Sequence, residues 1–153
     1  MGKLDGQTAV VTGASRGIGQ QVAELFASEG ANVVCTARTL NEGDHKILEG
    51  SLSGTVENIR KAGGNAVAIT SDVSVEESCE ELIAKSREAF GPISILVNNA
   101  ALNYYIPTEE YPTSRWVRCF AINVHAPFIL SKLVMPDTVS YTHLTLPTNG
   151  LGG

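Results

Sequence analysis

The stretch Thr12-Gly13-Ala14-Ser15-Arg16-Gly17-Ile18-Gly19 decides how this chain folds. The apolar run before it, residues 8–11, is typical of a buried strand, and residues 20–27 repeat apolar side chains at helical spacing. The glycines therefore lie on a strand-to-helix turn, where free N–H groups and the helix dipole favour a bound phosphate. In such a turn Gly13 takes the tight bend, Gly17 lets a ligand approach the backbone, and Gly19 lets the helix pack against the sheet.

Glycine spacing alone is a weak signal, because an ordinary glycine-rich turn shows the same pattern. Here a second apolar run at residues 32–37 follows the helix and is expected to be the next strand. The whole strand–helix–strand unit takes about 30 residues, the size that a parallel crossover needs. This context favours a dinucleotide-binding turn over an ordinary one.

The composition is typical of a soluble globular protein of one domain, with 153 residues, 43% of them hydrophobic and 18% charged. The net charge of −5 argues against nucleic acid as a partner, since nucleic-acid-binding domains usually present a basic patch. We expect no membrane partner and no signal segment, because no apolar run looks long enough to span a bilayer. Cys35, Cys79 and Cys119 are far apart and lack metal-ligand spacing, which favours reduced thiols in a cytoplasmic protein without a metal site.

The rest of the chain alternates short apolar strands with helical segments, which predicts a parallel sheet covered by helices. We expect strands at residues 7–12, 32–37, 66–70 and 93–97, the last apolar enough to be buried on both faces, and helices at residues 16–28, 51–62, 75–90 and 113–133. Residues 39–50 are polar and irregular, which indicates a loop longer than usual. The predicted class is α/β, a doubly wound parallel sheet (Rossmann fold) with strand order 3-2-1-4.

Arg38 ends the second predicted strand, at the point that faces the adenosine ribose in dinucleotide folds. An acidic residue there would bind the 2′-hydroxyl of NAD, whereas the forked guanidinium of an arginine holds a 2′-phosphate. Arg16, inside the glycine turn, can add a second positive charge on the same phosphate. We therefore expect NADP as the cofactor, with NAD possible if both arginines are only solvated surface charges.

Polar residues also follow the third and fourth predicted strands, on the side where open parallel sheets bind ligands. Asp72 is placed to accept a hydrogen bond from an adenine amino group. Ser74, with Glu77 three residues on, is the better candidate to cap the next helix, which would leave Asp72 free. Asn98 and Asn99 can hold the backbone of the sheet and line the ribose; a generic Asn turn is the alternative.

The last predicted helix carries one unusual polar residue. Asn123 is a poor helix former, and Pro127, four residues later, lacks the N–H that would bond to its carbonyl. The freed carbonyl can hold a water, or the pair can mark a tolerated kink. An apolar stripe on the same helix runs through Trp116, Phe120, Val124 and Phe128.

These motifs, in this order, resemble the short-chain dehydrogenase/reductase family over residues 4–136. The matches are Thr12-Gly13-x-x-x-Gly17-Ile18-Gly19, Asp72-Val73, Asn98-Asn99-Ala100 and Asn123 ahead of Phe128. Within the family, the pattern His45-x-x-Leu48-x-Gly50-Ser51 looks like the branch that contains hydroxysteroid dehydrogenase-like protein 2.

The resemblance implies hydride transfer between NADP(H) and a small carbonyl or alcohol substrate, in a parent protein that is expected to be a homo-oligomer. Asn123 would be the family's catalytic asparagine, whose carbonyl positions a proton-relay water. The resemblance implies cofactor contacts from Gly13, Ser15, Arg16, Gly17, Ile18, Gly19, Arg38, Asp72, Val73, Asn98, Asn99 and Ala100.

The sequence departs from the family at the residues that perform its chemistry. The family uses a Ser on a fifth strand and a Tyr-x-x-x-Lys helix, whose Tyr exchanges a proton with the carbonyl or alcohol. This sequence contains no Tyr-x-x-x-Lys, and Tyr141 is followed four residues later by Thr145. We expect residues 1–138 to be an incomplete NAD(P)-binding domain, truncated after the fourth strand and its helix, and the chain to be inactive.

From Val139 the sequence resembles the conceptual translation of a transposase-type sequencing-library adapter, so residues 139–153 are expected to be non-native; a natural short isoform is the alternative. Without further strands, the fourth strand becomes an exposed edge, and Trp116 and Phe120 are partly uncovered. We therefore expect a chain that is marginally stable or aggregates. Besides an enzyme fragment, a dinucleotide-binding module without chemistry and a partner of a full-length homologue remain as interpretations.

Overall fold

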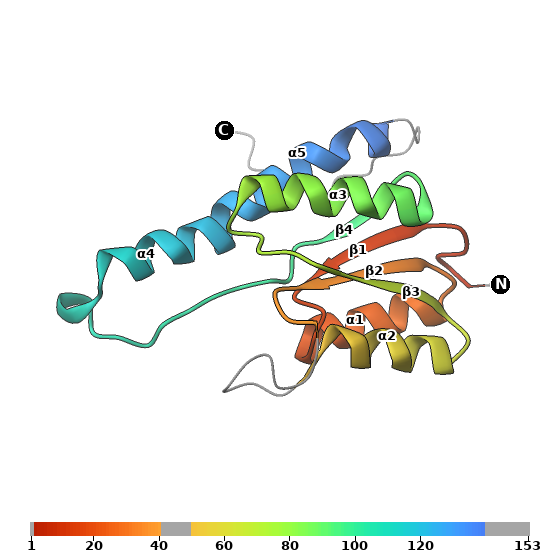
Figure 1. The fold of residues 1–153 in the computed structure, drawn as a ribbon, viewed down its shortest axis with the longest axis horizontal. Helices are drawn as coiled ribbons and strands as arrows, with labels where there is room; N and C mark the ends of the chain where they lie inside the picture. Colours follow the sequence, from red (N-terminus) through yellow and green to blue (C-terminus); the bar gives the residue numbers. More distant parts are fainter. Residues whose placement is uncertain (1, 41–49, 140–153) are drawn as a thin grey trace, which may run out of the picture.

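The computed structural model describes residues 2–40 and 50–139, and its strands and helices alternate along the chain (Figure 1). The strands are β1 (Thr8–Thr12), β2 (Asn32–Ala37), β3 (Asn65–Thr70) and β4 (Ile95–Val97). The helices between them are α1 (Gly17–Ser28), α2 (Leu52–Lys61) and α3 (Glu76–Phe90). A 3₁₀ turn, η1 (Thr108–Glu110), leads into α4 (Thr113–Phe120), the π-helical turn η2 (Ala121–His125) and α5 (Ala126–Val139).

In the described part of the chain, four parallel strands form one sheet in the order β3-β2-β1-β4. Val10 of β1 pairs with Val34 of β2 on one side and with Leu96 of β4 on the other. The predicted fold class and strand order are confirmed. The strand order reverses between β1 and β4, and open α/β sheets bind ligands at the carboxyl ends of the strands beside such a reversal.

Helices cover both faces of the sheet, because successive strand residues point to opposite sides. α1 and α2 lie on one face, and α3 and α5 lie on the other (Figure 1). Val11 of β1 is buried in the first layer with Ile59 of α2. Its neighbour Val10 is buried in the second layer with Leu82 of α3 and Leu130 of α5.

β4 is an edge strand beside β1, and its three residues are half-buried. This agrees with the predicted exposed edge and corrects the expectation of a strand buried on both faces. β4 is also shorter than predicted, since it begins at Ile95 rather than at Ile93. Before it, the Ile93 N–H donates to Asp137 Oδ2 (3.0 Å) of α5. Arg87 of α3 binds the same carboxylate (2.9 Å), so this ion pair joins α3, α5 and the approach to β4.

The last predicted helix is present, but it contains a π turn and ends at Val139 rather than at Leu133. Within η2 the hydrogen bonding widens, so that the Ala126 N–H donates to the Ala121 carbonyl, five residues back. Pro127, which has no N–H, follows at once. The helix therefore accommodates the missing donor with a π turn, a feature that is frequent at functional sites.

Trp116 and Phe120 of the apolar stripe are partly exposed, as predicted, and so are Val124 and Phe128. α4 extends beyond the sheet (Figure 1), and the described chain leaves large fractions of four side chains open to solvent. The exposed fractions are 56% for Trp116, 41% for Phe120, 51% for Val124 and 68% for Phe128. This apolar surface favours self-association.

The expectation that no apolar segment is long enough to span a bilayer needs correction. The continuous helix Thr113–Val139 is long and apolar enough to do so, by length and composition alone. A core helix of a soluble protein passes the same test, and α5 contributes Leu130 and Val134 to the core.

Two sequence predictions lie largely outside the described residues. The loop containing His45 falls mostly at residues 41–49, and the expected non-native tail falls mostly at residues 140–153. Val139, the first residue of that tail, is the last residue of α5.

Candidate functional site

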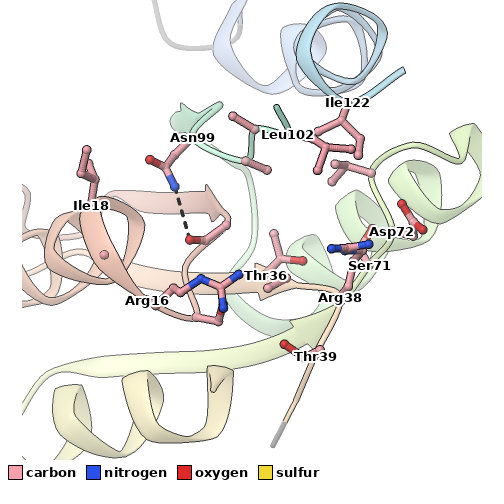
Figure 2. A pocket seen from close by; sticks show the side chains of 17 residues that line it. Arg16, Ile18, Thr36, Arg38, Thr39, Ser71, Asp72, Asn99, Leu102 and Ile122 are labelled. Atoms are coloured by element: carbon pink, nitrogen blue, oxygen red, sulfur yellow. Dashed lines mark hydrogen bonds between the residues drawn. The ribbon is translucent and has the colours of Figure 1, made fainter. Parts of the chain in front are cut away.

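A pocket of about 370 Å³ opens at the carboxyl ends of the strands, beside the first turn of α1. Figure 2 shows side chains entering it from several elements, with Arg16 at the glycine turn, Arg38 after β2 and Ile122 from η2. Its lining residues are Gly13, Ser15, Arg16, Gly17, Ile18, Thr36, Ala37, Arg38, Thr39, Ser71, Asp72, Val73, Asn99, Ala100, Ala101, Leu102 and Ile122.

The glycine turn has the backbone conformation that its sequence predicts. Gly13 and Gly17 have φ angles of 67° and 56°, in the left-handed region that favours glycine. A Cβ atom on Gly17 would meet open space, so a ligand can approach the backbone there. A Cβ atom on Gly19 would overlap the Gly13 carbonyl and the Asn99 amide, so Gly19 allows α1 to pack closely.

The start of α1 is suited to an anion and is held in place from two sides. Arg16 is the N-cap residue, and its side chain makes no capping hydrogen bond to the first turn of the helix. Backbone N–H groups at such a helix start attract negative charge. Thr55 Oγ1 of α2 donates to the Ala14 carbonyl (2.9 Å), and the Ala14 N–H donates to the Thr36 carbonyl of β2 (3.1 Å).

Asn99 joins the glycine turn to the end of β4. Its Nδ2 donates to the carbonyls of Thr12 (3.0 Å) and Gly13 (3.3 Å). The N–H groups of Asn99 and Ala100 both donate to Thr12 Oγ1. The expectation that an asparagine here holds the central backbone is therefore confirmed for Asn99, whereas Asn98 is exposed and does not line the pocket.

Asp72 lines the pocket after β3. Its carboxylate was predicted to be free, but Ser74 binds one of its two oxygens. Oδ1 accepts hydrogen bonds from the N–H (3.0 Å) and the hydroxyl (2.6 Å) of Ser74. Ser74 does not cap α3, whose N-cap residue is Val75 without a side-chain cap, because Asp72 forms its own turn at this point. Burial raises the pKa of Asp72, but the Ser74 hydrogen bonds and the charges of Arg118 and Arg38 bring it below its ordinary value.

Asn123 contacts the loop after β4 and does not line the pocket. Its Oδ1 accepts from the Leu102 N–H (2.9 Å), and its Nδ2 donates to the Leu102 carbonyl (2.8 Å). The side chain therefore positions this loop, and the neighbouring Ile122 lines the pocket. The role that the resemblance implies for the Asn123 carbonyl stays a prediction.

Most of the residues that the sequence suggested for a cofactor lie around this one pocket, but Gly19 and Asn98 do not line it. Thr36 was missed although a signal existed, since it lies two residues before Arg38 and therefore on the same face of the strand. Leu102 and Ile122 had no such signal, because they come from separate segments. The full set of lining residues that sequence reasoning missed is Thr36, Ala37, Thr39, Ser71, Ala101, Leu102 and Ile122.

Thr36 also indicates whether a nucleotide suits the pocket. Thr36 is fully buried, and its Oγ1 has no hydrogen-bond partner. Every other buried side-chain nitrogen or oxygen atom among the described residues has one. An unsatisfied buried polar group costs about 1–3 kcal/mol, which a partner in the pocket would offset. Together with the open Gly17 backbone and the two arginines, this atom fits a ligand that carries hydroxyl and phosphate groups.

No cysteine is among the described residues that line the pocket. All three cysteines are free. Burial, with a smaller effect from Glu24, raises the pKa of Cys35 to about 12. Burial, with smaller effects from nearby carboxylates, raises the pKa of Cys79 to about 11. Both thiols are therefore neutral at physiological pH and unreactive.

A model of the short chain dehydrogenase family matches residues 7–142. The chain belongs to this family. Hydroxysteroid dehydrogenase-like protein 2 from Rattus norvegicus is 39% identical over 135 residues, which cover 88% of this chain and 25% of that protein. The uncharacterized oxidoreductase YxbG from Bacillus subtilis is 36% identical over 154 positions, covering 100% of this chain and 53% of that protein.

A solved structure of a metagenomic short-chain oxidoreductase in complex with NADP resembles this short-chain dehydrogenase with a TM-score of 0.81 and 33% identity. The match covers 90% of this chain and 58% of that one. The chain thus spans about a quarter to a little over half of the length of these relatives. It shares their oxidoreductase family and their Rossmann-like fold.

Proposed function

We propose that this chain is the NADP(H)-binding part of an oxidoreductase that transfers hydride between nicotinamide and a carbonyl or alcohol. One observation carries the proposal: Arg16 and Arg38 line the same pocket from different elements, next to the glycine turn (Figure 2). A guanidinium binds a phosphate through two parallel hydrogen bonds. The 2′-phosphate is the group by which NADP differs from NAD.

Each part of the pocket suits a part of the cofactor. The open backbone at Gly17 and the first turn of α1 would hold the pyrophosphate. Arg38, helped by Arg16, would bind the 2′-phosphate, and Asp72 Oδ2 would accept from the adenine amino group. Ala100 would border the ribose on the β4 side. When bound, the cofactor supplies the hydride, and these residues bind and orient it.

We infer that the chain alone binds NADP(H) without turnover. The family's proton donor lies in a Tyr-x-x-x-Lys segment, which the sequence lacks. Binding and chemistry would then be separable in this chain, because the pocket residues precede the segment that acts on the substrate. A change in NADPH absorbance that depends on added ketone or alcohol would refute the inactivity of the chain.

The cofactor proposal is tested by titrating the full chain with NADP and with NAD and measuring both dissociation constants. We expect tighter binding of NADP, by about tenfold or more if Arg38 makes a bidentate contact. Arg38→Asp should reverse the preference. Arg115→Asp is the matched control, because Arg115 stacks on the Tyr104 ring (4.9 Å to the centroid) and does not line the pocket. Equal binding of both cofactors by the unchanged chain would contradict the proposal.

A further inference from the structure

Asp72 lies between two arginines that come from different elements. Its Oδ2 is 3.6 Å from an Nη atom of Arg118, which α4 carries. Arg38 shares a second, shallow hollow with Asp72 and acts on it electrostatically. Figure 2 shows the Arg38 guanidinium on the Asp72 side of the main pocket. Arg118 is not among the residues that line that pocket.

Asp72 is the one acidic side chain among the described lining residues. An ionised carboxylate at this position opposes a 2′-phosphate in two ways. It repels the phosphate directly, and it competes with the phosphate for Arg38. Both effects weaken when a second cation, from outside the residues that line the pocket, neutralises Asp72.

We propose that Arg118 is a specificity-determining residue, which neutralises Asp72 and thereby leaves Arg38 available to a 2′-phosphate. This inference rests on the proposed function, because it explains how a pocket with an acidic wall accepts NADP. Arg118 acts through Asp72 and is a positioning residue. Its ion pair is partly exposed, with 41% and 38% of the two side chains open to solvent, so its effect is expected to be small.

Arg118→Gln should raise the dissociation constant of NADP by about two- to fivefold and leave that of NAD within about twofold, as expected for one partly exposed charge pair. The loss should shrink at high salt, because screening weakens exposed charges. Arg118→Lys keeps the charge and should retain most of the preference. Arg115→Gln, the same change three residues earlier on α4, should leave the preference unchanged.

A double-mutant cycle separates this role from a general effect on folding. In an Asp72→Asn background, Arg118→Gln should no longer weaken NADP binding, because no carboxylate is left to neutralise. Titration of the Asp72 carboxyl by NMR is an independent readout, and Arg118→Gln should raise its pKa. Far-UV circular dichroism checks that each variant is folded. If Arg118→Gln itself does not fold, Arg118→Lys and Asp72→Asn carry the comparison.

The outcomes distinguish the inference from the proposed function. If the unchanged chain prefers NADP but Arg118→Gln weakens NADP and NAD equally, or acts equally in the Asp72→Asn background, the role of Arg118 is overturned and the proposed function stands. If the unchanged chain shows no preference for NADP, the proposed cofactor is wrong and the role of Arg118 falls with it.

Discussion

Gly19→Ala should destabilise this chain, whereas Gly54→Ala should not. Each glycine is the third residue of its helix, Gly19 in α1 and Gly54 in α2. Replacing a helical glycine by alanine favours folding by up to about 1 kcal/mol, because alanine loses less backbone entropy. This gain applies to both variants, so the difference between them measures the surroundings of the new methyl group.

Those surroundings differ in kind. The new Cβ at position 19 would overlap the Gly13 carbonyl and the Asn99 amide, which hydrogen bonds hold in place. At position 54 the nearest atom is Ser51 Oγ at 3.1 Å, a hydroxyl that can shift by a few tenths of an ångström. Overpacking in a fixed site costs about 1–3 kcal/mol. We therefore expect Gly19→Ala to be less stable than Gly54→Ala by about 1–3 kcal/mol.

Urea unfolding followed by circular dichroism measures this difference as a shift in the midpoint at constant slope. Gly19→Ala should also bind NADP more weakly, since the methyl group pushes apart the turn and Asn99. A Gly19→Ala variant that is as stable as Gly54→Ala would refute the close packing of α1 against the turn.

Three further predictions follow from other contacts. Burial raises the pKa of Asp137, but hydrogen bonds from Arg87 and the Ile93 N–H, with the charge of Arg87, bring it below its ordinary value. The ionised Asp137 therefore stabilises the folded chain above the unfolded pKa of about 3.9, and this contribution is lost as the pH falls through the folded pKa. Asp137→Asn should therefore cost about 1–3 kcal/mol at neutral pH and flatten the acid limb of a stability–pH profile; an unchanged limb would count against this pair. Thr36→Val should leave the thermal stability of the free chain equal or higher, because it removes an unpaired buried hydroxyl, and should weaken NADP binding in a titration by up to about tenfold; unchanged binding would show that Thr36 does not contact the cofactor. Phe128→Glu should reduce self-association in light scattering and change stability by less than about 0.5 kcal/mol, since this side chain is 68% exposed; unchanged scattering would exclude this face as its cause.

Local chemistry was sufficient to predict the elements and the glycine turn. Gly13 and Gly17 take positive φ angles because the turn between β1 and α1 requires them. The whole turn lies within a few residues of the sequence, so its motif could be recognised there. Strand order followed from the alternation of strands and helices, which limits the topologies of a parallel sheet. The place of Arg38 beside the pocket could also be predicted, because Arg38 follows β2 and the carboxyl ends of parallel strands meet at one edge of the sheet.

The exceptions all depend on partners that are distant in sequence. The Ile93 N–H, just before β4, donates to Asp137, which is 44 residues away in the sequence. The Asn123 side chain positions Leu102 across 21 residues, a contact that its sequence neighbours do not indicate. No periodicity or spacing encodes such contacts, because hydrophobic patterns specify which face is buried and not which polar group meets which.

The sequence by itself determined the glycine turn and the arginine at the end of the second strand, because residues within one strand–helix–strand unit set both. It also determined the α/β class and the strand order, because strands and helices alternate along the chain. Only the tertiary structure decided that Thr36 is buried without a partner, that Asp72 binds Ser74 and that Arg118 approaches Asp72 from α4. The physical reason is that hydrogen bonds and ion pairs form between whichever groups the packed helices bring within reach, and that packing is a property of the whole fold.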